Sequence, residues 1–304
     1  MLVLGWLLLL LAATALAARF LAAGNRWVVA TAALSPYLMP AAPVAAVVFG
    51  LSGHWGPVAV SAALTVAAVA VHLPWYLGAR LPGPGATVRF LSANLYLGKA
   101  EPAAVARLAI ESADILAVQE LTGELAEALS PLLATEFPYS TLRPRDKAAG
   151  VGLWSRFPIT DSGSDESFSR GFIHARVQAP ETEMTVVSTH MPPPRSAFTS
   201  WREDIRRLGP ALRAVPAAGP VIVGSDLNAT PDVREFRRLL RDGYRDGAAQ
   251  VHAGLTRTYP CHLPIPPFLA VDHILTRDAV ATSMRTVSVA GSDHLALAAT
   301  VVLH

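Results

Sequence analysis

The chain has 304 residues, of which 52% are hydrophobic and 16% are charged, and its formal net charge is +2. Soluble domains carry about 25% charged residues, so this composition argues against an ordinary cytosolic protein. One cysteine, Cys261, excludes an internal disulfide and a cysteine-cluster metal site. The imbalance is local, because residues 1–80 contain no Asp, Glu or Lys, whereas residues 81–304 carry a formal charge of −1. The sequence therefore predicts an apolar anchor followed by a near-neutral domain large enough for one core.

The anchor contains three apolar segments, each near the ~20 residues needed to cross a bilayer. They are Leu2 to about Leu21, Val28 to about Leu51, and Val58 to about Leu77. We predict three transmembrane helices over residues 1–80 and a multi-pass location in the cell membrane. A cleaved signal peptide followed by buried helices is the alternative, but the first residues lack a basic region. The second span contains prolines that predict a kink, at Pro36, Pro40 and Pro43.

The orientation of the anchor depends on few charges. Arg19 and Arg26 flank the first loop, and the second loop has only His54. The positive-inside rule then places the first loop, and with it the domain after the anchor, in the cytoplasm. Arg19 could also lie in the helix end and extend its guanidinium to the interface.

After the anchor, residues 81–86 form a short linker rich in Pro and Gly, and residues 87–304 form one domain with alternating strand and helix patterns. Many strands with interspersed helices predict an α/β fold in which helices cover two packed sheets. The expected strands are Thr87–Ala93, Asp114–Gln119, Val151–Ser155, His174–Gln178, Met184–Thr189, Val221–Gly224, Val271–Leu275, Met284–Ser288 and Leu295–Val302. The expected helices are Pro102–Ser112, Gly123–Ala134, Ala197–Val215, with a break or kink at Pro210, and Val233–Arg241.

Carboxylate and amide side chains recur at the ends of these strands. Each alone is typical of a turn or a helix cap, but open sheets place their active sites at such loops, so the set indicates one site. Its hard oxygen donors suit Mg²⁺ or Mn²⁺ rather than zinc. Two histidines add capacity for proton transfer and phosphate contact. The residues are Asn94, Glu120, Asp226, Asn228, Asp272 and Asp293, with His190 and His294.

The order of these motifs resembles the endonuclease/exonuclease/phosphatase superfamily, metal-dependent phosphoesterases that include DNase I, abasic-site endonucleases, sphingomyelinases and inositol-phosphate phosphatases. The resemblance extends from about Thr87 to the C-terminus and includes Gly150–Arg156, which matches the family's G-x-x-x-x-S-R strand. It implies a DNase I-like sandwich with two inner sheets. One departure is Ser225, which lies inside the family's G-D-x-N stretch.

The resemblance implies a role for each residue of the set. Glu120 would be the principal metal ligand, with Asn94 and Asp293 close to the ion directly or through water. Asp226 would orient and deprotonate the attacking water, with Asn228 positioning it.

The two histidines would contact the phosphate from opposite sides, with Asp272 orienting His294 and His190 acting across from it. Two loops are left without a role. Arg170, in the Phe168–Phe172 stretch, could contact phosphate at the mouth of the site but is interpreted as a solvated arginine, and Pro260–Phe268 could be a rigid loop near the site but is interpreted as an ordered connection.

A short tether to a membrane raises the effective concentration of lipid-borne phosphates. The anchor also resembles actinobacterial membrane proteins associated with glycopeptide resistance, which implies a polyprenyl diphosphate substrate and an extracytoplasmic domain, against the positive-inside argument. We therefore expect a Mg²⁺-dependent hydrolase of a lipid-linked phosphate.

One alternative is a membrane-tethered nuclease. The domain has only two lysines, Lys99 and Lys147, and this shortage of positive charge argues against nucleic-acid binding. Another is an inert lipid- or partner-binding module with a damaged metal site. The oligomeric state is left open.

Overall fold

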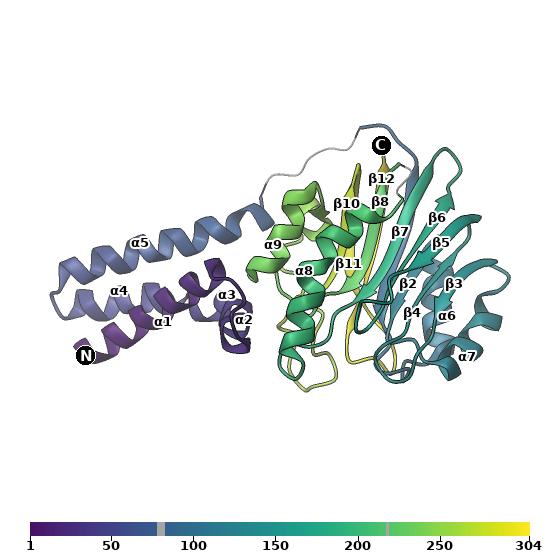
Figure 1. The fold of residues 1–304 in the computed structure, drawn as a ribbon. Helices are drawn as coiled ribbons and strands as arrows, with labels where there is room; N and C mark the ends of the chain where they lie inside the picture. The colour runs from purple at the N-terminus through teal and green to yellow at the C-terminus, as the bar shows by residue number, and fades with distance from the viewer. Residues whose placement is uncertain (78–82, 217–218) are drawn as a thin grey trace.

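The computed structural model describes residues 1–77, 83–216 and 219–304. Figure 1 shows an α/β sandwich from which the N-terminal helices project to one side. Residues 81 and 82 of the expected linker lie outside the described residues. The N-terminal elements are α1 (Leu2–Phe20), α2 (Arg26–Ala33), α3 (Ser35–Leu38), α4 (Ala41–Leu51), α5 (Trp55–His72) and the 3-10 turn η1 (Leu73–Trp75).

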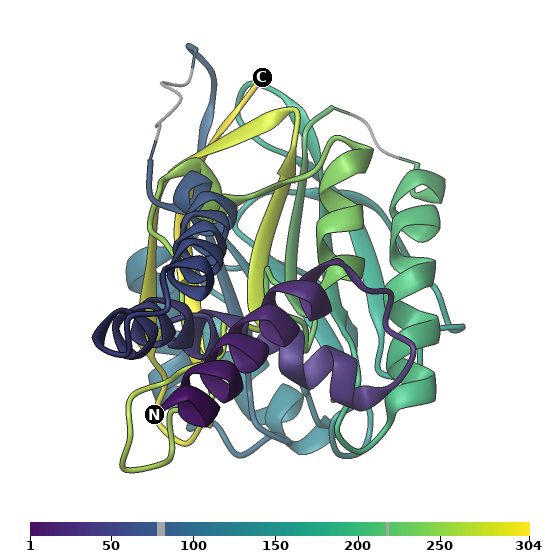
Figure 2. The same cartoon turned by 90° about the vertical axis from the view of Figure 1, so that its left-hand side faces the viewer.

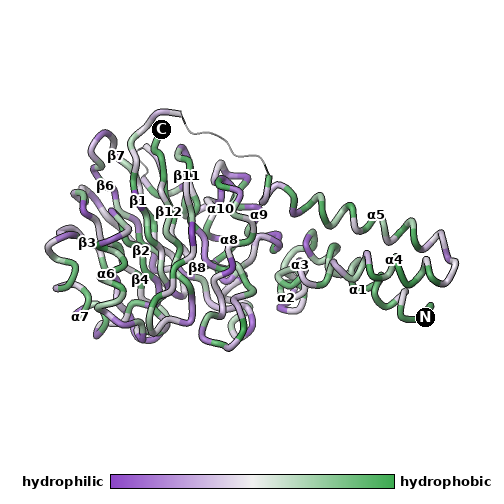
Figure 3. The backbone as a smooth tube through the Cα atoms, turned by 180° about the vertical axis from the view of Figure 1, so that it is seen from behind, coloured by the Kyte–Doolittle hydropathy of each residue, from purple (hydrophilic) through white to green (hydrophobic). Residues whose placement is uncertain are grey.

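Two of these helices, α1 and α5, are long and apolar enough to cross a membrane. The segment expected as the second span is broken, since Arg26–Ala33 and Ser35–Leu51 meet at an angle of 58°. Pro36, Pro40 and Pro43 lie in the second part, where a missing N–H and the proline ring disfavour continuation of a straight helix. A third span is present only if this bent pair is counted as one. Figure 3 shows these helices mostly in the green of hydrophobic residues, whereas green and purple alternate along the tube of the sandwich.

The sandwich contains two six-stranded sheets, in the orders β11-β12-β1-β2-β4-β3 and β5-β6-β7-β8-β10-β9. Its strands are β1 (Thr87–Asn94), β2 (Ile115–Gln119), β3 (Tyr139–Arg143), β4 (Val151–Ser155), β5 (Ile159–Ser164), β6 (Phe172–Gln178), β7 (Glu183–His190), β8 (Val221–Asp226), β9 (Arg245–Asp246), β10 (Asp272–Arg277), β11 (Ala279–Ser288) and β12 (Leu295–Leu303). Its helices are α6 (Pro102–Ser112), α7 (Gly123–Leu133), α8 (Phe198–Ala214), α9 (Arg234–Leu239), η2 (Leu240–Asp242) and α10 (Gly247–Gln250).

The alternation of side chains along β1 shows how the layers form. Val88 and Phe90 face the second sheet, whereas Leu91 and Ala93 face α6 and α7. Both sets are fully or almost fully buried, so each face of the strand contributes to a different core, as the two-residue period of a strand requires. The second sheet is covered on its outer face by α8 and α9. The predicted α/β sandwich with two inner sheets is therefore confirmed.

Three strands were not predicted: β3, β5 and β9. Both β3 and β5 lie at sheet edges and are partly exposed, so their sequences lack the apolar runs of the central strands. The break expected at Pro210 does not occur, because α8 continues through this residue.

The N-terminal helices pack against the sandwich at α9 and the loop before it. Arg19, at the end of α1, forms an ion pair with the buried Asp232, and His72 Nε2 lies 3.0 Å from the same carboxylate. The Ala23 N–H donates to Glu235 Oε1 at 2.9 Å. The charge of Arg19 is thus neutralised within the protein. Arg19 is therefore a weak indicator of which side of the membrane the first loop faces.

Candidate active site

Strand register brings the predicted residues to one end of the sandwich. In the first sheet, Asn94 of β1 pairs in parallel with Gln119 of β2, and Glu120 is the next residue. In the second sheet, Asp226 of β8 lies beside His190 of β7 and Asp272 of β10. Packing the two sheets face to face therefore places both sets of strand ends together.

Asp226 is the centre of the cluster, and its side chain is buried. Its Oδ2 accepts hydrogen bonds from Asn94 Nδ2 at 2.9 Å and Asn228 Nδ2 at 3.3 Å, and its Oδ1 accepts from the Asn228 N–H at 2.9 Å. Asn228 Nδ2 also donates to Met191 O at 3.0 Å. The Asn94 contact joins the two sheets at the site, and the carboxylate is held in one orientation.

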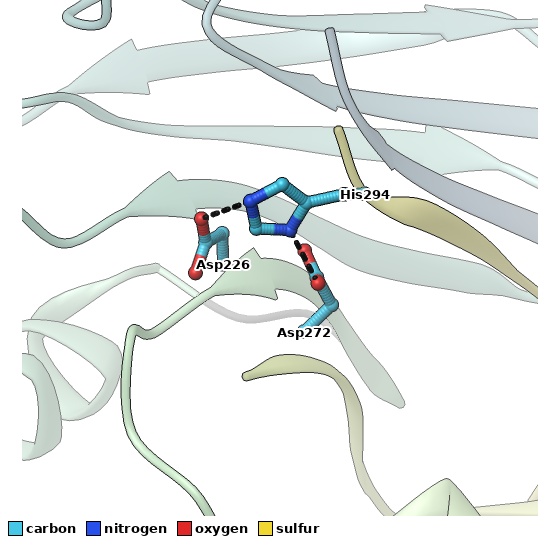
Figure 4. A group of neighbouring side chains, drawn as sticks. All are labelled: Asp226, Asp272 and His294. Carbon is cyan, nitrogen blue, oxygen red and sulfur yellow. Dashed lines mark hydrogen bonds and ion pairs between the residues drawn. The ribbon is translucent and has the colours of Figure 1, made fainter. Parts of the chain in front are cut away.

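A second group consists of His294, Asp272 and Asp226 (Figure 4). His294 Nδ1 lies 2.8 Å from Asp272 Oδ2, while Nε2 faces Asp226 Oδ2 at 3.9 Å. Asp293 Oδ1 is also 3.9 Å from His294 Nε2. Ser292 Oγ accepts from the His294 N–H and donates to Asn94 O at 2.8 Å, so it ties the turn before β12 to the end of β1.

Glu120 lies on the opposite side of this cluster and has φ 61°, a left-handed conformation that is uncommon outside glycine. Its Oε2 accepts a hydrogen bond from the Leu97 N–H at 2.5 Å. His190 Nε2 lies 3.7 Å from Glu120 Oε1 and 3.5 Å from Asp226 Oδ2. Asn228 is also left-handed, with φ 47°. Such backbone conformations cost energy and cluster at functional sites.

Four carboxyl groups gather here, and they outnumber the positively charged side chains beside them. Burial raises the pKa of the carboxyl groups of Glu120 and Asp293. Burial and the neighbouring charge of Asp272 raise the pKa of Asp226 to about 7. The protein alone therefore does not stabilise all of these groups as anions.

The two histidines differ in charge. Burial opposes protonation of His294, but the charge and hydrogen bond of Asp272 prevail and raise its pKa to about 10. Burial and the positive charge of Arg170 lower the pKa of His190 to about 3. His294 is thus a cation at neutral pH, whereas His190 is neutral.

The unprotonated nitrogen of His190 fits a site that holds a cation. Its Nδ1 lies 2.9 Å from the carbonyl oxygen of Ala148, which can only accept, so Nδ1 carries the proton. Nε2 is then a buried lone pair that has no hydrogen-bond partner among the residues that the structure describes, and it faces the Glu120 and Asp226 carboxylates. Buried polar atoms are normally satisfied, and a divalent cation bound by the surrounding oxygens would relieve this repulsion.

The ligand set follows from which atoms are free to donate electrons. Within the described residues, the donor atoms of Asp226, Asp272 and His294 lie within 4.8 Å of one another. We do not interpret this group as the metal site, because His294 is protonated and a protonated imidazole cannot ligate a cation. The two aspartates instead orient His294 and keep it protonated. Glu120, Asn94 and Asp293 remain the predicted ligands, and their oxygens suit Mg²⁺ or Mn²⁺.

Two side chains from loops complete the site and were not predicted as members. Arg170 Nη1 lies 3.8 Å from Glu120 Oε1, so its interpretation as a solvated arginine was wrong. The ring of Tyr259 contacts that of His294, with centroids 4.7 Å apart. The only sequence signal for them was their location in loops that follow or precede motif strands.

Comparisons with known proteins bear on the fold of the domain. A sequence profile of the Endonuclease/Exonuclease/phosphatase family matches residues 91–294. Among solved structures, an endonuclease/exonuclease/phosphatase from Bacteroides vulgatus is 17% identical, with 72% of this chain and 100% of that chain covered and a TM-score of 0.59. Sphingomyelinase C from Streptomyces griseocarneus is 18% identical, with 71% of this chain and 99% of that chain covered and a TM-score of 0.52. D. rerio TDP2 complexed with a single-strand DNA product is 15% identical, with 71% of this chain and 99% of that chain covered and a TM-score of 0.60. No curated protein sequence matches the chain.

Proposed function

Because the chain belongs to the endonuclease/exonuclease/phosphatase family, we propose that it is a membrane-anchored, Mg²⁺- or Mn²⁺-dependent hydrolase that cleaves a phosphoester or diphosphate bond in a lipid-linked substrate. The observation that carries this proposal is the largely buried cluster of Glu120, Asn94, Asp226, His190 and His294 at the meeting ends of both sheets. Hydrolysis of a phosphate ester requires a positioned water and stabilisation of phosphate charge, and this cluster has groups for both.

Asp226 is the base that accepts a proton from the attacking water. A pKa of about 7 is close to the value at which a general base works best near neutral pH. Asn94 and Asn228 hold its carboxylate in place through their amide groups. A divalent cation bound at Glu120, Asn94 and Asp293 would supply Lewis-acid stabilisation of the phosphate.

His294 and Arg170 provide positive charge on two sides of the cluster. The Asp272 carboxylate fixes the Nδ1 proton of His294, so that the Nε2 proton is aimed toward Asp226 and the phosphate. Arg170 lies beside Glu120, across the site. The neutral His190 offers an unprotonated Nε2 between them, which can accept a hydrogen bond.

The substrate class is inferred from the anchor. The first and fifth helices suffice by length and composition to hold the chain in a membrane, and the ion pair of Arg19 with Asp232 holds the domain against their ends. The site is therefore kept near the headgroup layer, where lipid-borne phosphates have a high effective concentration. We place the domain on the extracytoplasmic side, which labelling of Cys261 by an impermeant thiol reagent in intact cells would test.

A substrate panel tests this function. Full-length protein in detergent is given Mg²⁺, Mn²⁺ or EDTA with a polyprenyl diphosphate, sphingomyelin, phosphoinositides or single-stranded DNA. We expect metal-dependent release of phosphate or headgroup from at least one lipid and not from DNA. Salt-sensitive DNA cleavage without lipid turnover would instead support a tethered nuclease, and no turnover in any arm would contradict the proposal.

Replacing Asp272 with Asn is expected to lower kcat by roughly 100-fold, because His294 loses the charge that keeps it protonated and oriented. The activity should also begin to fall at a lower pH on the alkaline side, since the pKa of His294 decreases. The matched control is Asp278→Asn, an exposed aspartate at the other end of β10. An unaltered pH profile of kcat in the Asp272 variant would contradict this role for the His294 pair.

A further inference from the structure

The loop Pro260–Phe268 exposes apolar side chains beside the site. Leu263 and Ile265 are 43% and 50% exposed, and prolines at 260, 264, 266 and 267 limit the conformations that the loop can adopt. Elsewhere in residues 87–216 and 219–304, large apolar side chains with this degree of exposure are few: Leu97, Leu132 and Tyr139. Exposed apolar side chains that are gathered on one part of a surface can mark a protein or membrane contact, and Leu263 and Ile265 are gathered in this way on one stiff loop.

The loop is attached to the site. The Cys261 N–H donates to Asp293 O at 2.9 Å, and the ring of His262 stacks on Tyr96 with centroids 6.3 Å apart. Tyr96 is followed by the exposed Leu97, whose N–H donates to Glu120. Leu97 and the loop therefore form two parts of one rim around the site.

The same loop is attached to the N-terminal helices. Tyr37, in α3, donates from its hydroxyl to Phe268 O at 2.6 Å and accepts from Arg257 Nε at 2.7 Å. Its ring also meets that of Phe268 edge to face. Figure 2, seen from the side of the N-terminal helices, shows the yellow-green loop projecting next to them at the lower edge of the sandwich. The rim of the site is thus continuous with the anchor.

The ends of the N-terminal helices beside the domain place this rim near the expected surface of the bilayer. The ends of α1 and α2 that lie toward the domain expose Phe20 and Trp27, which are 58% and 69% exposed. Aromatic residues at the end of a span are typical of the membrane–water interface. Between residues 260 and 268 there is no acidic side chain, and Arg257 and His262 lie at its base, so the loop is compatible with anionic headgroups.

We propose that Pro260–Phe268 is a membrane-contacting loop, which inserts Leu263 and Ile265 into the interfacial layer of the bilayer that holds the anchor. Leu97 faces the same layer from the other side of the rim. The site then receives a phosphate headgroup from the bilayer surface while the lipid tail stays in the membrane. The headgroup part of this inference rests on the proposed function, whereas the membrane contact does not.

A depth measurement tests the contact without any substrate. Because the chain has one cysteine, the full-length double variant Cys261→Ser, Ile265→Cys can be spin-labelled at one position and placed in vesicles of phosphatidylcholine and phosphatidylglycerol. We expect the label to collide more with oxygen than with a water-soluble nickel chelate. The matched control, Cys261→Ser with Leu132→Cys on α7, should show the reverse, because Leu132 is exposed and α7 lies at the far end of the sandwich (Figure 1). Equal, water-like accessibility at both positions would overturn the proposal.

An activity comparison tests the consequence. Leu263→Asp with Ile265→Asp is expected to lower turnover of the lipid substrate in vesicles by roughly 10-fold or more, and to leave hydrolysis of soluble bis(4-nitrophenyl) phosphate unchanged. Leu132→Asp should change neither. An equal loss on both substrates would show that the loop acts through the site and would overturn the membrane role. If the wild-type protein cleaves neither substrate, the proposed function fails, and the spin-label result still decides the membrane contact.

Discussion

Replacing Glu120 with Gln is expected to abolish metal-dependent hydrolysis by removing the principal ligand of the cation. The carboxylate is mostly buried, and it accepts a hydrogen bond from the Leu97 N–H at 2.5 Å. An amide keeps the size of the side chain but loses its charge, which a hard divalent cation requires. Mutation of residues that only hydrogen-bond to metal ligands lowers the affinity for the metal 10- to 100-fold. Because Glu120 is expected to be a direct ligand, its replacement should lower the affinity for Mn²⁺ by at least roughly 100-fold.

The measurement is Mn²⁺ binding by electron paramagnetic resonance, with turnover recorded on the same samples. Glu181→Gln, at an exposed glutamate, is the matched control and should bind Mn²⁺ like the wild-type protein. Burial raises the pKa of Glu120, so this variant should not destabilise the metal-free protein. Unchanged Mn²⁺ affinity in a folded Glu120 variant would show that the cation is bound elsewhere in the cluster, for which Asp226, Asp272 and Asp293 are the other carboxylates in reach.

Much of the fold could be predicted because the central strands have strong patterns. The run Val221–Val223 is continuously apolar, and it forms a strand buried on both faces, as expected for the middle of a covered sheet. The edge strands β3 and β5 could not be predicted in this way, because one or both of their faces are exposed and their residues are mostly polar. The N-terminal helices show a second limit, since the prolines of the second apolar segment predicted a kink but not that the helix breaks, with a bend of 58° between Arg26–Ala33 and Ser35–Leu51.

The site was predictable as a set of residues but not as an arrangement. Asn94 and Asp226 each follow a strand that the sequence reveals, yet their contact at 2.9 Å depends on how two sheets pack, which no local pattern encodes. Arg170 and Tyr259 have no motif at all, and only the folded loops bring them to Glu120 and His294. The contact of Arg19 with Asp232 is similar, because its partners are far apart in the chain.

Replacing Asp226 with Asn is expected to lower kcat by roughly 1000-fold, within the 10² to 10⁴ that a positioned general base contributes. The fold should survive, because two effects on stability oppose each other. An Asn side chain at position 226 turns an NH₂ group toward groups that donate hydrogen bonds to the Asp226 carboxylate. The lost hydrogen bond lowers the free energy of unfolding by about 1–3 kcal/mol.

The opposing effect is the loss of a buried charge. The pKa of Asp226 is raised from 3.8 to about 7, so in the metal-free protein its ionisation destabilises the fold progressively as the pH rises through this range. Above pH 7 this cost is fully present, and the neutral amide does not incur it. At pH 8 in EDTA the melting temperature of the variant should therefore equal or exceed that of the wild type, with Asp278→Asn as the control. A folded Asp226→Asn protein that retains wild-type kcat would exclude Asp226 as the base, and His190, with its unprotonated Nε2 3.5 Å away, would be the group left to accept the proton.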